Sequence, residues 1–572
     1  MPGLGDEIVD RLRDLALRRL GFEAAWQQAA DVACPEASDF MSMGQVLGAN
    51  NAALTIDVPQ AARRSAKIYD TTAITAVDRL ASGLEALIVP QSEYWHNLDI
   101  ETFKRKPLAD DTKVWLEDLR EGMFKIRYDA DSGWVTAIQT CLRRMVVFGN
   151  AFMWIEDATM QGPKRYGDKD EFIRYQYMPL NECYVAEDHQ GRVDTLIRPY
   201  FLTARQAVQR FGDRTPANIK AMAERPGNTE QRFTFIQAIL PRRDFKANVL
   251  GIQGAPWSSV HVELESKKVV KESGFWEFPV VDFRWLPEPG RVYAEGPIMR
   301  CLADIQSLQL LAKNELAANE QAVNPPLLVA NAGIMNRPSN RPGAINLGGM
   351  SPNGQKLIEA MLPPGRLDFA SQIKMAAQNQ VKESLYINLF ELLVRSPEMS
   401  ATQAVIRANE KGELLGPAGS RVQQGLSRLI ERELGILVRA GIFDRDSMFY
   451  PPESAIRAGG KRLVPEFRSP IDRLRRTKEA EGTMRTLEIM SPIAQIDNSV
   501  VDNFEADTMA RGLGEVFGMP TRFLRPQEQV DAIRQQRAQA MAAQQQAQIA
   551  QQLAAASAQG STAVQNLQQT GI

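Results

Sequence analysis

The feature that most constrains the fold is a series of helical patterns between Gly296 and Ile442. Gly296-Pro297 favours a helix start, because proline suits the first helical turn. Apolar residues then recur at three- and four-residue spacing, which indicates one apolar stripe. The stripe comprises Ile298, Leu302, Ile305, Leu308, Ala312 and Leu316. Prolines at Asn324-Pro325-Pro326 predict the end of the helix, and roughly 27 residues give a length of about 40 Å.

Two more long helices are predicted after a segment rich in proline and glycine. One covers about 371–393, and the other begins near Ser400, which has capping-box spacing to Gln403. This last helix meets Gly416-Pro417. Because proline inside a helix costs about 3 kcal/mol or more, we expect two limbs there. Long consecutive helices separated by a loop-rich segment are unusual in a compact enzyme. They favour a structural protein whose helices form the wall of a larger assembly.

Composition predicts a large globular protein with several domains. The chain has 572 residues, of which 44% are hydrophobic and 24% charged. A formal net charge of −2 argues against a dedicated, tight nucleic-acid binder, although DNA could still pass along a surface. Four cysteines without CxxC pairing predict reduced thiols in a cytosolic setting. We expect neither export nor membrane spanning, because we find no signal-peptide pattern and no long apolar run.

The remaining chain alternates between helical and β patterns. Helices are predicted at about 6–33, 61–87, 111–127 and 134–147, followed by a β-rich stretch from 172 to 286 that contains a hairpin at 183–201 and a short helix from Thr203. Helices are again predicted at about 471–490 and 499–518. The tail from Pro526 is rich in alanine and glutamine. Such a tract buries little surface, so we expect it to be disordered or helical only inside an assembly.

The search for catalytic chemistry is negative. The sequence contains no GxxxxGK[ST] motif, so no P-loop nucleotide site is predicted. His96, His189 and His261 are remote from one another and lack a metal-binding spacing such as HExxH. Adjacent carboxylates at Asp110-Asp111 and Glu187-Asp188 are interpreted as helix caps and turns. We therefore predict no catalytic, cofactor or metal site.

Three lysines on the predicted long helices are candidate channel-lining residues. They are Lys313, Lys374 and Lys382. They either line a lumen or pair with acidic residues on the helix surfaces, and pairing is slightly favoured. Those acidic residues are Glu315, Glu320 and Glu383.

Two groups of arginines leave further alternatives open. Arg337 and Arg341 in the loop-rich segment face DNA, a partner protein or water. The basic run at 473–478 is a solvated helical face or, less favoured, a patch facing DNA or another subunit, since arginine binds phosphate and carboxylate in bidentate fashion.

Several segments carry a combined signal when taken in chain order. They are Asp78-Arg-Leu-Ala-Ser-Gly-Leu-Glu-Ala-Leu-Ile-Val-Pro90 with Trp95, Val147-Phe-Gly-Asn-Ala-Phe152, Gly296-Pro297, Asn324-Pro-Pro-Leu-Leu-Val329, Ser400-Ala-Thr-Gln403 and the Gln/Ala-rich tail. Together they resemble the portal or head-to-tail connector family of short-tailed double-stranded DNA phages. The resemblance covers nearly the whole chain. It implies an α+β, predominantly helical portal-type fold in a ring of about twelve identical subunits, with DNA passing through a central channel.

The resemblance also implies a domain plan. Residues 1–292 form a β-containing wing, 293–323 and 371–394 form two stem helices, and 324–370 form a loop-rich clip. Residues 402–442 form a long kinked helix, 443–525 the wing return and crown, and 526–572 a tail that is a barrel or disordered.

The loop at 395–401 corresponds to the family's channel loop, with Arg395 and Glu398 as its charged members. Its other named members are Ser396, Pro397 and Met399. The clip, with Arg337 and Arg341, corresponds to the docking platform for terminase and the tail adaptor. Capsid and scaffolding proteins, and internal core proteins, are further implied partners. The implied location is the portal vertex of the virion, reached from the host cytoplasm, and the family does no catalysis.

Two other functions compete with this interpretation. A nucleic-acid enzyme would need clustered carboxylates or His/Cys ligands, which the sequence lacks. A capsid or tail-adaptor protein without a DNA channel stays open, although two long helices around a clip-like loop speak against it.

Overall fold

The computed structural model describes residues 3–37, 65, 67–101, 108–158, 172–225, 227–247, 249, 251–329, 345, 350–351, 353–360, 367–387, 401–445, 447, 449–457, 462–468, 482–492, 503–516, 519, 523–525 and 527–569. At 367–369, 401–415, 527–528 and 555–569 only the helical backbone is described. The chain divides into two units. The first comprises 1–99, 119–450 and 463–475, and the second comprises 100–118, 451–462 and 476–572.

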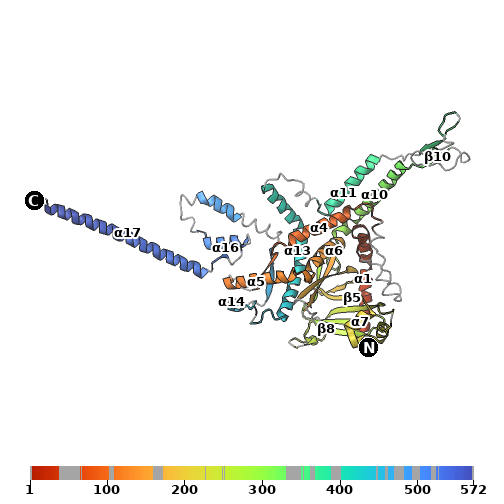
Figure 1. The fold of residues 1–572 in the computed structure, drawn as a ribbon, viewed down its shortest axis with the longest axis horizontal. Coiled ribbons are helices and arrows are strands. Elements are labelled where there is room, and N and C mark those ends of the chain that lie inside the picture. Colours follow the sequence, from red (N-terminus) through yellow and green to blue (C-terminus); the bar gives the residue numbers. More distant parts are fainter. Residues whose placement is uncertain are drawn as a thin grey trace. The chain divides into compact units, whose positions relative to one another are not determined.

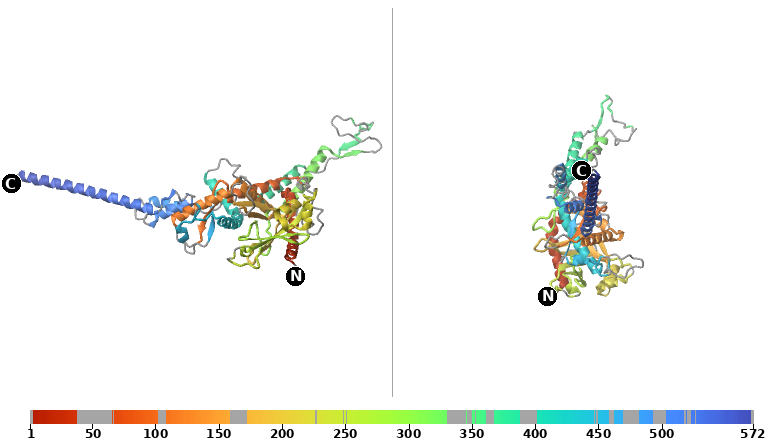
Figure 2. Two further views of the ribbon diagram at one scale, coloured as in Figure 1. Left: turned by 60° about the horizontal axis from the view of Figure 1, so that its bottom comes forward. Right: turned by 90° about the vertical axis from the view of Figure 1, so that its left-hand side faces the viewer.

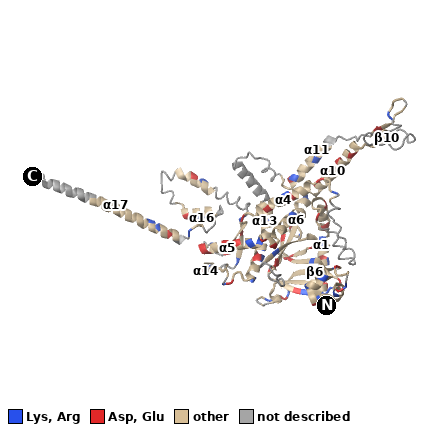
Figure 3. Ribbon diagram, viewed as in Figure 1, with Lys and Arg blue, Asp and Glu red and all other residues tan. Residues whose placement is uncertain are grey.

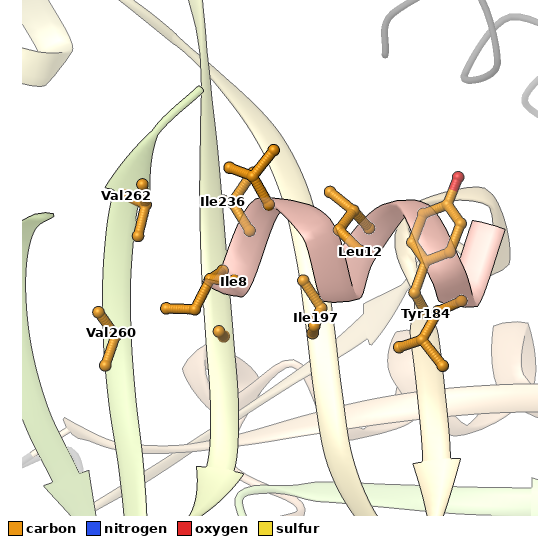
Figure 4. Packing of buried hydrophobic residues seen from close by; sticks show 10 residues of the cluster. Ile8, Leu12, Tyr184, Ile197, Ile236, Val260 and Val262 are labelled. Carbon is orange, nitrogen blue, oxygen red and sulfur yellow. The ribbon is translucent and has the colours of Figure 1, made fainter. Parts of the chain in front are cut away.

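A five-stranded antiparallel sheet forms one part of the first unit, in the order β4-β5-β6-β7-β8. Its strands are β4 (Tyr184–Glu187), β5 (Val193–Thr203), β6 (Arg232–Pro241), β7 (Trp257–Glu263) and β8 (Val269–Phe275). Helix α1 (Leu4–Ala33) lies across one face of this sheet, as Figure 4 shows. Ile8 and Leu12 of α1 pack there against Ile197, Ile236 and Val262.

Two short helices cover the other face of the same sheet. They are α7 (Ala204–Phe211) and α8 (Ala217–Ala223), which contribute Phe211 and Ile219 to a core with Phe235. Helix α7 begins at Thr203, whose hydroxyl accepts from the Gln206 backbone N–H while the Gln206 side chain accepts from the Thr203 N–H. This reciprocal cap fixes the helix start that the sequence predicted.

A three-stranded antiparallel sheet, in the order β3-β2-β9, forms a second core of the first unit. Its strands are β2 (Asn150–Asp157), β3 (Ile173–Met178) and β9 (Val280–Arg284). Helix α6 (Trp134–Phe148) packs against β2 and β3, and α4 (Thr72–Ile88) packs against α6. Helix α13 (Ala401–Arg439) packs against β9. A pair of strands, β1 (His96–Ile100) and β12 (Leu463–Phe467), completes the sheets of this region.

Two of the segments that carry the family resemblance touch each other. Gly149, after α6, has a φ of 76°, and a Cβ there would lie 2.4 Å from the Ala294 carbonyl oxygen. A Cβ on Gly296 would lie 2.6 Å from the Gly149 nitrogen. Asn150 closes the junction, because its side-chain amide donates to Ala294 O at 2.8 Å and accepts from Ala294 N at 2.9 Å. The contact holds the chain at the point where the long helices begin.

The predicted first long helix is divided by Cys301 into α9 (Pro297–Arg300) and α10 (Leu302–Val323). The next helix, α11 (Leu367–Ser384), lies beside α10, and the strands β10 (Leu327–Val329) and β11 (Ile358–Ala360) pair antiparallel beyond the end of α10 (Figure 1 and Figure 2). We call α10 and α11 the stem pair. We call β10 with β11 the clip strands, because they lie within the predicted clip.

The second unit contains α14 (Glu453–Arg457), a helical stretch at 482–492, α16 (Ala506–Val516) and α17 (Gln527–Gln569). Helix α5 (Asp110–Arg127) has its first residues in this unit. Asp111 accepts from the Thr112 N–H and from the Ser454 hydroxyl, and Arg511 pairs with Asp110. Asp111 is the second residue of α5, so its carboxylate accepts from a backbone N–H of the first helical turn without being the N-cap. In the described part of the first unit, 3₁₀ turns lie at Ala130–Ser132, Leu180–Glu182, Gly212–Arg214 and Ile252–Gly254.

The structure confirms an α+β, predominantly helical fold and corrects several details. Helix α13 continues through Pro417 as one helix, so a break at this proline is wrong, and the kink between two limbs stays a prediction. Buried Val422, Leu426 and Leu429 hold the part that follows, and this packing outweighs the local cost of proline. The prediction also missed β8 and α8, and it interpreted the clip strands as loop. The predicted helix at 471–490 lies largely outside the described residues.

Candidate channel and docking regions

The stem pair carries all three lysines that the sequence singled out. Lys374 of α11 pairs with Glu315 of α10 at 2.5 Å, and these side chains are 27% and 18% exposed. Lys313 is exposed, with its ammonium 5.8 Å from the centre of the Tyr69 ring. Lys382 is half-buried near the end of α11. Of the two alternatives for these lysines, pairing with an acidic residue therefore holds for Lys374. Its ion pair with Glu315 connects the two stem helices.

A polar cluster where α4 begins joins both stem helices, and we call it the stem bracket. Its members are Tyr69, Asp70, Gln309 of α10 and Gln378 of α11. The Gln309 side chain accepts from the Tyr69 and Asp70 backbone N–H groups at 2.8 and 3.0 Å and donates to Asp70 O at 2.6 Å. The Gln378 amide donates to Asp70 Oδ2 at 2.7 Å. Sequence reasoning missed the stem bracket, because no spacing rule pairs a glutamine with a backbone about 240 residues away.

Asp70 is ionised in this setting. Burial opposes its charge, but hydrogen bonds from Thr72 and Gln378 and the charge of Lys374 outweigh burial and lower the pKa of Asp70. The Thr72 backbone N–H also donates to Asp70 Oδ1 at 2.8 Å, so the same carboxylate caps the start of α4. One side chain therefore contacts α4 and α11 directly.

Helix α13 is anchored by a buried ion pair. The Arg127 side chain is fully buried and donates to both carboxylate oxygens of Glu433, with Nε at 3.0 Å from Oε1. The Tyr175 hydroxyl donates to Glu433 Oε1 at 2.5 Å. Burial disfavours the charge of Arg127, but Glu433 outweighs burial and raises the Arg127 pKa. Glu433 is 1% exposed, and its pairing explains how a carboxylate occupies a core position of α13.

His96 belongs to the same cluster and is structural. Burial and the charges of Arg127 and Arg120 hold its pKa well below 6.5. The ring is therefore neutral, and its Nε2 accepts from Arg127 at 3.1 Å. His261 is similar, with its pKa lowered to about 3 by burial and nearby cations, and its Nδ1 lies 2.9 Å from the Tyr200 hydroxyl. Each of these two histidines therefore has a hydrogen-bond partner in the core, Arg127 for His96 and Tyr200 for His261.

A second set of charges holds α13 against the turn between β8 and β9. Glu277 pairs with Arg432 and with Arg439, each at 2.6 Å. A Cβ on Gly435 would lie 2.3 Å from the Glu277 carboxylate, so the glycine leaves room for it. Arg428 pairs with Asp282 of β9. The C-terminal half of α13 is thus fixed by both apolar and ionic contacts.

Other candidate chemistry is weak in the described part of the chain. No group of three or more histidine, cysteine or acidic residues there could hold a metal ion. All four cysteines are buried and free, and burial raises the pKa of Cys34 and Cys183 to about 12 and of Cys301 to about 11. Such thiols are not activated nucleophiles. None of the described helices combines the length and the apolarity that a membrane span requires.

Several predicted site residues lie outside the described residues. They are the channel-loop residues Arg395, Ser396, Pro397, Glu398 and Met399, the clip arginines Arg337 and Arg341, and the basic run at 473–478. Acidic and basic residues alternate in short stretches along the described ribbon (Figure 3). This mixture agrees with the near-neutral charge of the sequence.

Comparison with known proteins identifies relatives that match almost the whole chain. A portal protein of Salmonella phage epsilon15 is 27% identical over 551 residues, covering 94% of this chain and 92% of the relative. A probable portal protein of Bordetella phage BPP-1 is 28% identical over 559 residues, with the same coverages.

Among solved structures, chains from the neck of a native gene transfer agent particle with C12 symmetry and of an empty particle with C6 symmetry match at TM-scores of 0.30 and 0.31. Their identities are 9% and 10%, with 68% of this chain and 89% and 90% of those chains covered. Similarity this low carries no structural argument. The family described as bacteriophage head to tail connecting protein, by contrast, matches residues 5–524. The chain therefore belongs to the bacteriophage head to tail connecting protein family.

Proposed function

We propose that this head-to-tail connecting protein is a portal subunit, which forms a ring of about twelve copies at one capsid vertex. The observation that carries the proposal is the stem pair with the clip strands at its far end, in a chain that matches the connector family from residue 5 to 524. Two packed helices with a strand pair beyond them suit a wall that crosses a shell and presents a docking surface.

In this proposal each region has a part. Residues 1–292 are the wing, 293–323 and 371–394 are the two stem segments, and 324–370 are the clip with Arg337 and Arg341 at its docking surface. The stem pair lies within the stem segments except that α11 begins four residues earlier, at Leu367. The loop at 395–401 narrows the channel, with Arg395, Ser396, Pro397, Glu398 and Met399 nearest the DNA. Residues 402–442 form the channel helix, 443–525 the wing return and crown, and 526–572 the tail. Lys313 and Lys382 are the stem lysines with the freest access to a channel, since Lys374 is held by Glu315.

The ring serves as the channel for DNA entry during packaging and for DNA exit at ejection. Its proposed partners are other copies of the chain, double-stranded DNA, the terminase large subunit, tail adaptors, and capsid, scaffolding and internal core proteins. The subunit works in the virion, after assembly in the host cytoplasm, and does no catalysis itself. A net charge of −2 suits this role, because many phosphate contacts would retain DNA rather than let it slide.

Electron microscopy of the purified full-length chain, with native mass measurement, tests the proposal. The expected result is a ring with a central hole and a mass of about twelve subunits of 63.8 kDa. A monomer or compact dimer at every concentration would overturn the proposed function.

Deletion of residues 395–401 then tests the channel loop. The expected variant still forms rings of wild-type mass but fails to package or retain DNA. Wild-type packaging by this variant would remove the loop from the proposal.

A further inference from the structure

The stem pair is held to the body of the first unit by two different kinds of contact. Ile305, Leu308 and Ala312 of α10 are buried, and such apolar contacts tolerate small rotations because they have no preferred direction. The stem bracket is directional. Gln309 makes three hydrogen bonds of 2.6 to 3.0 Å to the backbone of Tyr69 and Asp70. Hydrogen bonds weaken steeply with misalignment, so Gln309 fixes the orientation of α10.

The same bracket fixes the second stem helix. Gln378 of α11 donates to Asp70 Oδ2, while Asp70 Oδ1 accepts from the Thr72 N–H at the start of α4. Lys374 and Glu315 tie α11 to α10 at positions four residues from Gln378 and six residues from Gln309. Rocking the stem pair as a unit against α4 would therefore break bonds from both helices at Asp70. Because α9 and α10 are separate helices on either side of Cys301, the helical backbone does not itself prevent such rocking.

We infer that the stem bracket is an angle-setting device: by locking the stem pair to the body of the subunit, Asp70, Gln309 and Gln378 select one ring stoichiometry. This inference rests on the proposed ring. Their role is positional, since they act through the orientation of α10 and α11.

The geometry of ring closure gives the inference its scale. A closed ring of about twelve copies requires a rotation of about 30° between neighbours, and rings of about eleven or thirteen differ by only 2–3°. Over the 22 residues of α10, roughly 33 Å of helix, such a tilt moves the helix end by about 1.5 Å. At Gln309, about 10 Å from the start of α10, the same tilt amounts to about 0.5 Å, which lengthens and misaligns the three directional hydrogen bonds of the stem bracket together. In the proposed ring, the stem pair and the rest of the first unit both contact the neighbouring copy. A rigid connection between them is then needed for both contacts to have the same rotation between neighbours.

The test is the distribution of ring masses of the full-length chain, measured by native mass spectrometry. The wild-type chain should give one predominant stoichiometry. Gln309→Ala and Gln378→Ala should each still give rings, now divided between two or more neighbouring stoichiometries in comparable amounts. Gln380→Ala is the matched control, because Gln380 is an exposed glutamine of α11, and it should give the wild-type distribution.

A conservative variant separates orientation from general destabilisation. Gln378→Lys supplies a new donor to the Asp70 carboxylate and should restore a single predominant ring, which a merely loosened fold would not do. One uniform ring of wild-type mass from both alanine variants would overturn the inference. If Gln309→Ala does not assemble, Gln378→Ala, which removes only one hydrogen bond, decides the question. Absence of rings from the wild-type chain would overturn the proposed function instead.

Discussion

The helices α13 and α17 have similar lengths, 39 and 43 residues, but very different surroundings. Leu429 and Leu437 of α13 are 0% and 1% exposed, whereas Met541 and Leu553 of α17 are 64% and 66% exposed. Helix α13 is also fixed by Glu433, Arg432 and Arg428. The C-terminal half of α13 is therefore stabilised by tertiary contacts, while the described part of α17 relies on the helix propensity of alanine and glutamine.

The largest expected effect in α13 is the loss of Glu433. Glu433→Ala leaves the Arg127 charge buried without its carboxylate, and breaking such a pair costs about 3–5 kcal/mol. Urea unfolding should show this loss. The matched change is Gln424→Ala on the exposed side of the same helix, which should change the free energy of unfolding by less than about 0.5 kcal/mol. Equal effects of the two changes would contradict the anchoring role.

The close approach at Gly149 should also be costly. Gly149→Ala places a Cβ within 2.4 Å of backbone atoms, so the junction before α9 must shift, and we expect a loss of about 2–4 kcal/mol. Gly191 is the matched control. It has the same φ of 76° but nothing within 4 Å of its Cβ position. Gly191→Ala should cost only about 1–2 kcal/mol, the cost of the left-handed conformation. The difference between the two free energies of unfolding measures the contact alone.

The buried His261 should make the five-stranded sheet sensitive to mild acid. The pKa of His261 in the folded chain is about 3, below its ordinary value of 6.5, so on acidification the unfolded chain takes up the proton first. Stability is therefore lost as the pH falls from about 6.5 toward 3, at up to about 1.4 kcal/mol per pH unit for one such group. His261→Gln should have a shallower decline of unfolding free energy between pH 6.5 and pH 4 than the wild type. A parallel decline in the two proteins would refute this assignment.

The smallest effect is expected in α17. Replacing Met541, Ile549 and Leu553 with glutamine removes only exposed apolar surface, so the unfolding free energy of the unassembled subunit should change by less than about 0.5 kcal/mol. The free energy of unfolding should be measured both for assembled rings and for dissociated subunits. A loss of stability confined to rings would show that these residues are buried between copies.

Much of the architecture follows from local patterns. Apolar spacing predicted α1, α6 and α10 closely, and alternation predicted β3 and the β4–β5 hairpin, because these elements have one face toward a core. The lysines of the stem were also recognised, as was the pairing of Lys374. The predictions that were wrong concern contacts outside the local pattern. The helix continues through Pro417 because the residues that follow it pack in the core. The clip strands were interpreted as loop because they pair across about 30 positions.

The sequence by itself determined the long helices, the absence of a recognisable catalytic pattern and the resemblance to phage connectors, since each is written in local spacing and residue type. The tertiary structure alone decided that Gly149 meets Gly296, that Glu433 finds Arg127, and that Gln309 and Gln378 converge on Asp70. Those contacts join residues from 147 to more than 300 positions apart. Their partners are chosen by how whole elements pack, and no local pattern reports that choice.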